Sequence, residues 1–195
     1  MDEVKNILLA GVGGQGTILV SKVLTQGLVD AGFDVKMSEV HGMAQRGGSV
    51  STQVRYGAKV YSPIIGKGGV DILVAFEKLE ALRYSSYLKP RGILIVNDYE
   101  TLPLSVSSGS ETYPGGIIEA LKAKFRTIAI DAAFIALRIG NAKTMNVVLL
   151  GAMAGTLNMV GMDWEKALRA QVPERVIEVN LAAFKAGWEA AEHPT

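Results

Sequence analysis

The sequence predicts an α/β fold, a three-layer α/β/α sandwich whose sheet is mixed but mostly parallel. Short apolar runs of strand length alternate with longer segments whose apolar residues recur at helical spacing, which is typical of this class. A glycine-rich turn at residues 11–16 separates the first apolar run from the first helical segment, as at the start of many open α/β sheets. Because no stretch of the 195 residues reads as a linker, we expect one domain spanning residues 1–195.

Six segments are predicted to be strands, because each is short and either apolar throughout or alternating. They span residues 6–10, 33–39, 49–56, 70–76, 92–96 and 126–130. The segments at 70–76 and 92–96 are apolar nearly throughout, as buried strands are. Residues 49–56 alternate between apolar and polar side chains, and a short turn at 57–59 leads into Val60 and Tyr61. We therefore expect a β-hairpin here, which would make the sheet mixed.

Helical segments follow most of these strands. They are expected at residues 15–31, 78–88, 117–124, 144–160, 163–171 and 173–191, with Gly32 ending the first and residues 90–92 the second. Gly151 and Gly155 match the pattern G-x-x-x-G, which here indicates close helix packing. Residues 102–116 are rich in serine, proline and glycine, so we expect either a mobile loop or an arm that contacts a partner.

Composition excludes several classes of function. The net charge is +1 without a basic cluster among aromatics, so neither a nucleic acid nor a membrane is expected as partner. The absence of cysteine excludes disulfides, a cysteine nucleophile and a cysteine-ligated iron–sulfur cluster in this chain. With only His41 and His193, no metal site is predicted. The N-terminus does not resemble a signal peptide and no apolar run is long enough to span a bilayer, so a cytoplasmic protein is expected.

The turn at residues 11–16 is the first candidate binding site. Glycines let a backbone approach a ligand closely, and the first N–H groups of the following helix point at a phosphate or carboxylate. The candidate residues are Gly11, Gly13, Gly14, Gln15, Gly16 and Thr17. The spacing also matches the dinucleotide fingerprint, with Glu39 near the position of a ribose-binding acid. A tight turn that only packs a helix against the sheet explains the pattern equally well.

A second glycine-rich loop follows the strand predicted at residues 33–39. Its candidate residues are His41, Gln45, Arg46, Gly47, Gly48 and Ser49. We expect this loop to face the first turn across a crevice, where open α/β sheets bind their ligands. Arg46 offers a fork of donors for phosphate or carboxylate, and His41 offers a proton relay or an anion donor. The alternative for each is a hydrogen bond that orders the loop, or a solvated side chain.

The sequence contains no self-sufficient catalytic set. No serine lies in a nucleophile elbow, no pair of carboxylates has an evident role, and no cluster of metal ligands is visible. Because an enzyme needs activated groups or a cofactor, we assign no catalytic residue and expect the chemistry to be supplied by another chain.

Several segments together resemble the gamma-type domain of the 2-oxoacid:ferredoxin oxidoreductases. They are residues 6–16, the loop at 41–50, Tyr61-Ser62-Pro63, the strand and helix at 71–88, Met145-Asn146 with Leu150-Gly151-Ala152, and residues 178–187. The resemblance covers nearly the whole chain, and two glycine loops in this order make it specific. Within the family, the chain is most similar to the small (beta) subunits of the indolepyruvate type.

The resemblance implies a subunit of a heteromeric oxidoreductase of amino-acid catabolism. Enzymes of this family oxidatively decarboxylate a 2-oxoacid, here an arylpyruvate such as indolepyruvate, to acyl-coenzyme A and pass electrons to ferredoxin. The thiamine diphosphate and the iron–sulfur clusters would belong to a large alpha subunit, the partner of this chain, with coenzyme A as co-substrate. The candidate residues would bind an anionic group of coenzyme A or lie against that subunit. Thr17 departs from the aliphatic residue of many relatives, and its hydroxyl would add an anion contact.

Two other functions remain compatible with the sequence. One is an independent NAD(P)-dependent oxidoreductase that uses Gly11, Gly13, Gly16 and Glu39, which predicts tight NAD binding by the isolated chain. The other is a non-catalytic assembly module, which predicts that the large subunit is fully active alone.

Overall fold

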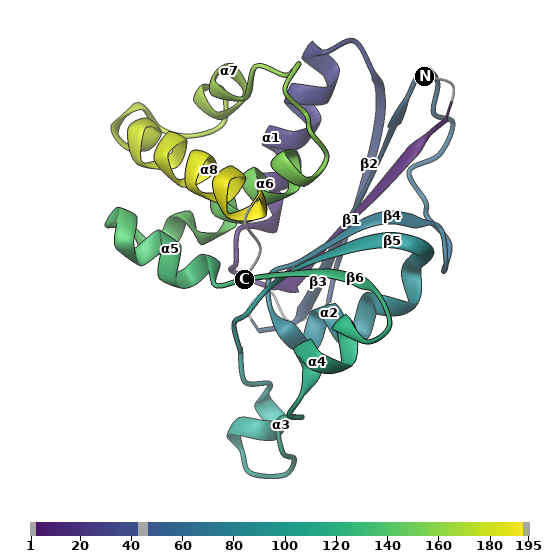
Figure 1. Cartoon of the computed structure of the whole chain (residues 1–195), viewed down its shortest axis with the longest axis vertical. Coiled ribbons are helices and arrows are strands. Elements are labelled where there is room, and N and C mark those ends of the chain that lie inside the picture. The colour runs from purple at the N-terminus through teal and green to yellow at the C-terminus, as the bar shows by residue number, and fades with distance from the viewer. Residues whose placement is uncertain (1–2, 43–46, 193–195) are drawn as a thin grey trace.

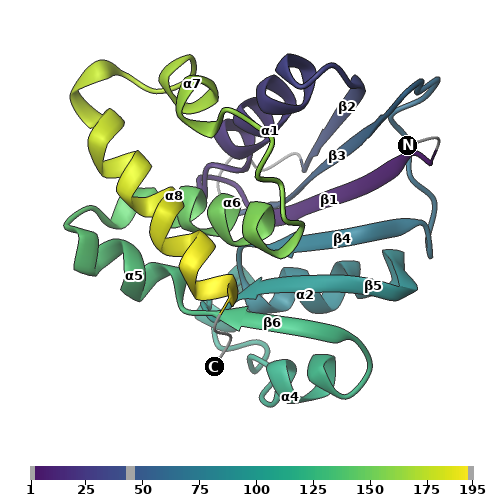
Figure 2. The ribbon, with the colours of Figure 1, turned by 45° about the horizontal axis from the view of Figure 1, so that its top comes forward.

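A six-stranded sheet between two layers of helices forms the fold in the computed structural model, which describes residues 3–42 and 47–192 (Figure 1). The strands are β1 (Lys5–Val12), β2 (Asp34–His41), β3 (Ser49–Gly57), β4 (Val70–Ala75), β5 (Leu88–Asn97) and β6 (Arg126–Ile130). Their spatial order is β2-β3-β1-β4-β5-β6 (Figure 2). β1, β4, β5 and β6 are parallel, whereas β3 pairs antiparallel with both β1 and β2. The predicted mixed, mostly parallel sheet is confirmed.

Helices cover the two faces of the sheet unevenly. One face carries α1 (Thr17–Asp30), α5 (Ala132–Ile139), α6 (Met145–Thr156), α7 (Trp164–Arg169) and α8 (Ile177–Glu192), and the other carries α2 (Lys78–Tyr84) and α4 (Ile117–Lys122). α3 (Leu104–Ser107) lies on a projection away from the sheet (Figure 1). In β1, Ile7 and Leu9 face the larger core while Leu8 and Ala10 face the smaller one, because successive strand side chains alternate. Among the helices described, none is long and apolar enough to cross a membrane.

The prediction of a β-hairpin over residues 49–61 is wrong. β3 pairs with β2 and β1, and no strand is described between β3 and β4. The segment that connects β3 to β4 is held by side-chain hydrogen bonds rather than by pairing with another strand. The N–H of Val60 donates to the Asp34 carboxylate at 2.9 Å, and the Arg55 guanidinium donates to the Ser62 carbonyl at 2.8 Å. The sheet is mixed for a different reason, since β3 returns antiparallel beside β1.

The helix predicted at residues 78–88 ends earlier than expected. α2 stops at Tyr84, a short 3₁₀ helix (η1, Ser85–Tyr87) follows, and β5 begins at Leu88. Pro90 therefore lies inside a strand rather than after a helix. It is exposed, and the pairing of β5 with β4 is irregular between Val70 and Ile72. Such an irregular strand start accommodates a residue that has no N–H to donate.

α6 and α8 pack with their backbones in contact. A Cβ built on Gly151 would lie 2.0 Å from the carbonyl oxygen of Phe184, and one on Gly187 would lie 1.9 Å from the carbonyl oxygen of Val148. Only glycine fits at both positions. The G-x-x-x-G pattern at residues 151–155 therefore serves close helix packing, as predicted, and holds α6 between the sheet and α8.

We expect Gly187→Ala to lower the free energy of unfolding by about 2 kcal/mol or more, because its methyl group would force α8 away from α6. Urea unfolding followed by circular dichroism measures this difference. Gly161→Ala is the matched control, since nothing lies within 4 Å of a Cβ at that position. Equal stability of the two variants would contradict the tight packing.

Glu77 connects the end of β4 to the start of α2. Its carboxylate accepts hydrogen bonds from the N–H groups of Leu79 at 2.8 Å and Glu80 at 2.9 Å, which caps the helix. The hydroxyl of Tyr113 donates to the same carboxylate at 2.9 Å. Burial raises the pKa of Glu77, and these hydrogen bonds oppose that shift only in part.

The raised pKa of Glu77 predicts a pH-dependent stability. Above the ordinary pKa of 4.5, the folded chain retains a proton that the unfolded chain has lost. The free energy of unfolding contributed by this group therefore falls as the pH rises from 4.5 through the folded-state pKa. We expect Glu77→Gln to remove this part of the pH dependence in a series of urea unfolding curves.

The exposed carboxyl of Glu119, on α4, offers a matched control for that series. Glu119→Gln should keep the wild-type pH dependence. If Glu77→Gln also keeps the wild-type pH dependence, burial does not raise the pKa of Glu77 in the folded chain.

Candidate functional site

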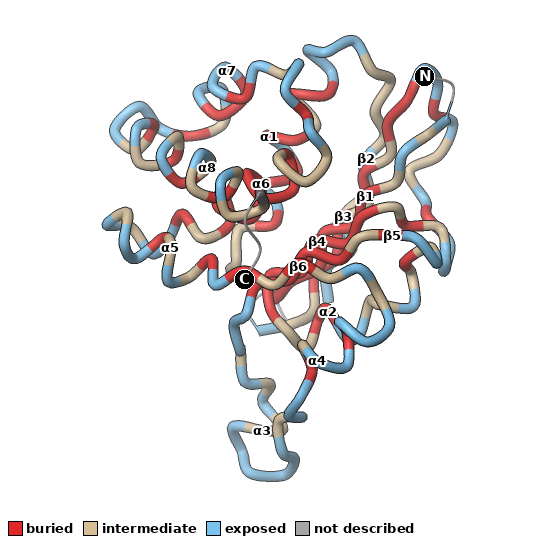
Figure 3. Tube along the Cα trace, viewed as in Figure 1, coloured by how far each residue is buried: buried red, intermediate tan, exposed pale blue. Residues whose placement is uncertain are grey.

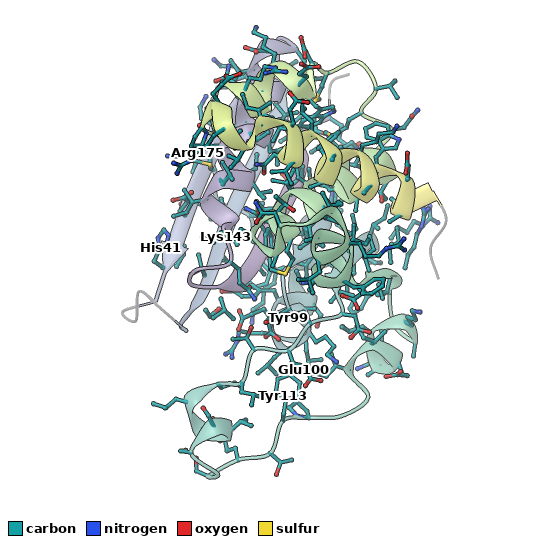
Figure 4. All side chains as sticks on the ribbon, turned by 90° about the vertical axis from the view of Figure 1, so that its left-hand side faces the viewer. His41, Tyr99, Glu100, Tyr113, Lys143 and Arg175 are labelled. Atoms are coloured by element: carbon teal, nitrogen blue, oxygen red, sulfur yellow. The ribbon has the colours of Figure 1, made fainter. Side chains whose placement is uncertain are left out.

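The carboxyl ends of β1, β4, β5 and β6 meet at one edge of the sheet, and the first glycine turn lies there. Open α/β sheets bind their ligands at this edge. Besides the turn, the edge carries Lys78 after β4, Tyr99 and Glu100 after β5, and Asp131 after β6. In Figure 4, Tyr99, Glu100 and Tyr113 lie close together, Lys143 lies above them, and His41 lies apart at the end of β2.

The glycine turn is held in shape by its own residues. Gly16 has a φ of 79°, a left-handed conformation that favours glycine, and it precedes α1 without a side-chain cap. The Oε1 atom of Gln15 accepts a hydrogen bond from the Val12 N–H at 2.8 Å, and its Nε2 donates to Thr101 Oγ1 at 3.2 Å. Gln15 therefore ties the turn to the segment after β5. The first N–H groups of α1 point out of the helix end, as at an anion site.

Asn146, at the start of α6, completes the turn from a distant part of the sequence. Its Nδ2 donates to the carbonyl oxygen of Gly16 at 3.2 Å. A Cβ on Gly16 would lie 2.3 Å from the same nitrogen, so only glycine leaves room for this contact. Asn146 was not among the predicted site residues. A single asparagine in an apolar helix does not indicate, from the neighbouring sequence, which distant residue it will contact.

The two glycine loops are in direct contact rather than separated by a crevice. The N–H of Gly13 donates to the carbonyl oxygen of Gly48 at 2.9 Å, and Val12 pairs with Ser49 across the β1–β3 ladder. The hydroxyl of Ser49 hydrogen-bonds the carboxylate of Glu80 on the opposite side of the sheet. The predicted crevice is therefore not found between the described parts of the two loops, and Ser49 is oriented away from the turn. Gln45 and Arg46 lie outside the described residues, and Gly47 is exposed.

His41 and Glu39 lie on the edge strand β2, away from the turn. The Nε2 of His41 is 3.9 Å from the Glu39 carboxylate, which also accepts a hydrogen bond from Ser21 on α1 at 3.1 Å. Because β3 lies between β1 and β2, Glu39 is two strands from the turn rather than on the adjacent strand. This order removes the geometry on which the dinucleotide alternative depends.

A cavity of about 600 Å³ opens beside the first glycine turn. It is lined by Gly14, Gln15, Gly16, Tyr99, Thr101, Ala133, Leu137, Ala142, Lys143, Met145 and Asn146. Lys143, in the 3₁₀ helix η2 (Ala142–Thr144), is exposed and forms no ion pair with any described residue. The cavity thus combines an uncapped helix N-terminus and one cation with an apolar wall, an arrangement suited to an anion with an apolar body.

Two predicted residues, Gly11 and Thr17, lie behind the turn instead of in the cavity. Both are buried. A Cβ on Gly11 would lie 2.9 Å from Gln15 Oε1 and 3.1 Å from Phe76 Cβ and Thr17 Cγ2. Gly11 is therefore needed for packing, and Thr17 turns its methyl group towards it.

Lys78 and Tyr113 lie at the carboxyl ends of the parallel strands, on the face of the sheet that α2 and α4 cover. The Nζ of Lys78 lies 2.7 Å from the Glu100 carboxylate and 3.2 Å from that of Asp98, and its hydrogen bond to Glu100 raises the pKa of Lys78. Burial, followed by the nearby charge of Glu77, raises the pKa of Tyr113. A second cavity of about 470 Å³ is lined by Lys78 and its two carboxylate partners, so its wall carries charges of both signs. Across residues 3–42 and 47–192, no cluster of three or more side chains suited to hold a metal ion was found.

Comparison with known proteins identifies the family. Residues 6–190 match the family described as pyruvate ferredoxin/flavodoxin oxidoreductase. The chain is 38% identical to the indolepyruvate oxidoreductase subunit IorB of Pyrococcus horikoshii and 39% identical to that of Thermococcus kodakarensis, in each case over 96% of both chains. Among solved structures, it is similar to the gamma subunit of a keto/oxoacid ferredoxin oxidoreductase from Geobacter sulfurreducens, with a TM-score of 0.70 and 27% identity over 96% of this chain and 98% of that one.

The resemblance seen in the sequence thus extends from end to end, and it agrees with the mixed sheet and the glycine turn at its edge. The chain belongs to the pyruvate ferredoxin/flavodoxin oxidoreductase family, as a small subunit of a 2-oxoacid:ferredoxin oxidoreductase.

Proposed function

We propose that the substrate of the complex is an arylpyruvate, with indolepyruvate as the first candidate. The reaction is an oxidative decarboxylation to the acyl-coenzyme A, with electrons passed to ferredoxin. The observation that carries this proposal is the end-to-end similarity to subunits named for indolepyruvate.

The redox chemistry belongs to a large partner subunit that carries thiamine diphosphate and the iron–sulfur clusters. The diphosphate cofactor supplies an electron sink for decarboxylation, and the clusters accept the electrons. The absence of cysteine from this chain supports that division, since a cluster needs thiolate ligands that this chain lacks. Ferredoxin would then meet the complex through the partner.

The role of this chain is to bind the anionic part of coenzyme A at the glycine turn. Gly14 and Gly16 allow a phosphate to approach the backbone, and the uncapped N-terminus of α1 adds donors. Lys143 contributes a cation at the mouth of the same cavity, while Leu137 and Met145 offer apolar contact to the uncharged part of the ligand. Gln15 and Asn146 keep the turn in the shape that this binding needs.

Native mass spectrometry of the complex, purified gently and without oxygen, tests the function. We expect this chain to co-purify with a larger chain that holds thiamine diphosphate and iron–sulfur clusters. The complex should reduce ferredoxin only when both an arylpyruvate and coenzyme A are present. A lone chain, or one that holds NAD, would refute the proposal.

Lys143→Ala tests the binding role of the cavity. Because one exposed charge–phosphate contact is lost, we expect the apparent KM for coenzyme A to rise by about two- to fivefold with kcat nearly unchanged. Steady-state kinetics of the intact complex measures both constants. Lys124→Ala, another exposed lysine that does not line the cavity, is the matched control.

An unchanged KM for coenzyme A combined with weaker association of the subunits would place Lys143 at the subunit interface. In that case the glycine turn would lie against the partner and bind no small molecule.

A further inference from the structure

α5 leaves two of its large apolar side chains uncovered, although Ile135 and Ile139 pack against the core. Ala132 and Ala136 face the core, whereas the larger Phe134 and Leu137 are 55% and 63% exposed. The guanidinium of Arg138 lies 5.9 Å from the centre of the Phe134 ring and covers it only in part. Because a core-facing side already exists, the exposed phenylalanine and leucine form a second apolar face, which indicates contact with another protein surface.

The segment from Asp98 to Gly116, called here the arm, also exposes large apolar side chains. Leu102 is 54% exposed and Leu104 is 85% exposed, and Figure 3 shows the region of α3 in the colours of exposed and intermediate residues, with none buried. Its serines hydrogen-bond within the arm. The hydroxyl of Ser105 donates to the Glu111 carboxylate at 2.8 Å, and that of Ser107 donates to the Pro103 carbonyl at 2.8 Å. The polar groups thus organise the arm while its leucines remain uncovered.

Two consecutive residues, Glu77 and Lys78, hold both ends of the arm. At its start, the N–H of Lys78 donates to the Tyr99 carbonyl at 3.0 Å, and its ammonium pairs with the Glu100 carboxylate. At its end, Tyr113 donates to the Glu77 carboxylate. The arm is therefore fixed to the rigid end of β4, and it presents its leucines in a defined place without burying them.

The arm and α5 converge on the cavity at the glycine turn. Tyr99, at the start of the arm, and Leu137, on α5, both line that cavity. Figure 1 shows α5 and α3 projecting from the same end of the sheet in different directions. A partner seated on both would also cover the mouth of the cavity.

We propose that Leu102 and Leu104 of the arm, with Phe134 and Leu137 of α5, form a docking surface for the large thiamine- and cluster-bearing subunit. The surface fits an apolar partner face. This inference rests on the proposed function, and it names the part of this chain that meets the partner.

The large subunit fits this surface better than a second copy of the same chain. The cavity continuous with the surface must open towards the chain that performs the chemistry. A second copy seated here would close the cavity against a chain that has no cysteine to ligate a cluster. Docking of the large subunit would instead exclude water from the cavity and bring it next to the reacting groups.

The double variant Leu104→Ser/Phe134→Ser, in the full complex, tests the docking surface. Neither residue lines the cavity, and both side chains are exposed, so the fold should keep its melting temperature. We expect the dissociation constant between the two subunits to rise at least about tenfold in a dilution series followed by native mass spectrometry. The matched control is Ile64→Ser/Val160→Ser, which replaces two other exposed apolar residues and should leave that constant unchanged.

Two results would overturn the docking surface. One is an unchanged dissociation constant in the double variant while the wild-type complex forms normally, which leaves the proposed function intact. The other is a wild-type chain that pairs with itself and loses this pairing in the variant, which assigns the surface to a second copy. If the wild-type chain associates with no thiamine-bearing partner, the proposed function and the docking surface both fail.

Discussion

The site depends on the close approach of α6 and α8. Gly151 and Gly187 let the two backbones touch, and this contact fixes where α6 begins. The start of α6 carries Asn146 to the carbonyl oxygen of Gly16 and brings Met145 to the wall of the cavity. Glycine at position 16 is in turn the only residue that leaves room for Asn146. Packing between two helices thus determines the shape of a turn at the opposite end of the sequence.

The residues that follow β4 fix the position of α2 and of the arm. Glu77 caps α2 and receives Tyr113, while Lys78 pairs with Glu100. Burial of Glu77 is unfavourable for its charge, as its raised pKa indicates, yet its carboxylate satisfies two backbone N–H groups and one hydroxyl. Burying this carboxylate lowers the stability of the fold, but its hydrogen bond from Tyr113 fixes the arm to the sheet.

The proposed function is that of a subunit that binds a co-substrate and docks on its partner. The described residues offer an uncapped helix N-terminus, one cation and an apolar wall at the cavity, and large apolar side chains beside it. In that proposal, the chain positions a co-substrate and excludes water, while its partner supplies the cofactors. The proposed division would account for a chain without cysteine in a family of redox enzymes.

Local patterns were enough to predict the fold class, most strand positions, the glycine turn and the G-x-x-x-G contact, because periodicity and glycine spacing are local signals. They misplaced a hairpin at Val60 and the end of α2, since the hydrogen bond to Asp34 and the strand around Pro90 depend on distant partners. The three-dimensional arrangement was needed to show that Gln15 braces the turn, that Asn146 and Lys143 lie beside it, and that α5 exposes Phe134 and Leu137. Those contacts join residues up to 130 positions apart, and no pattern within one segment encodes which distant segment will pack against it.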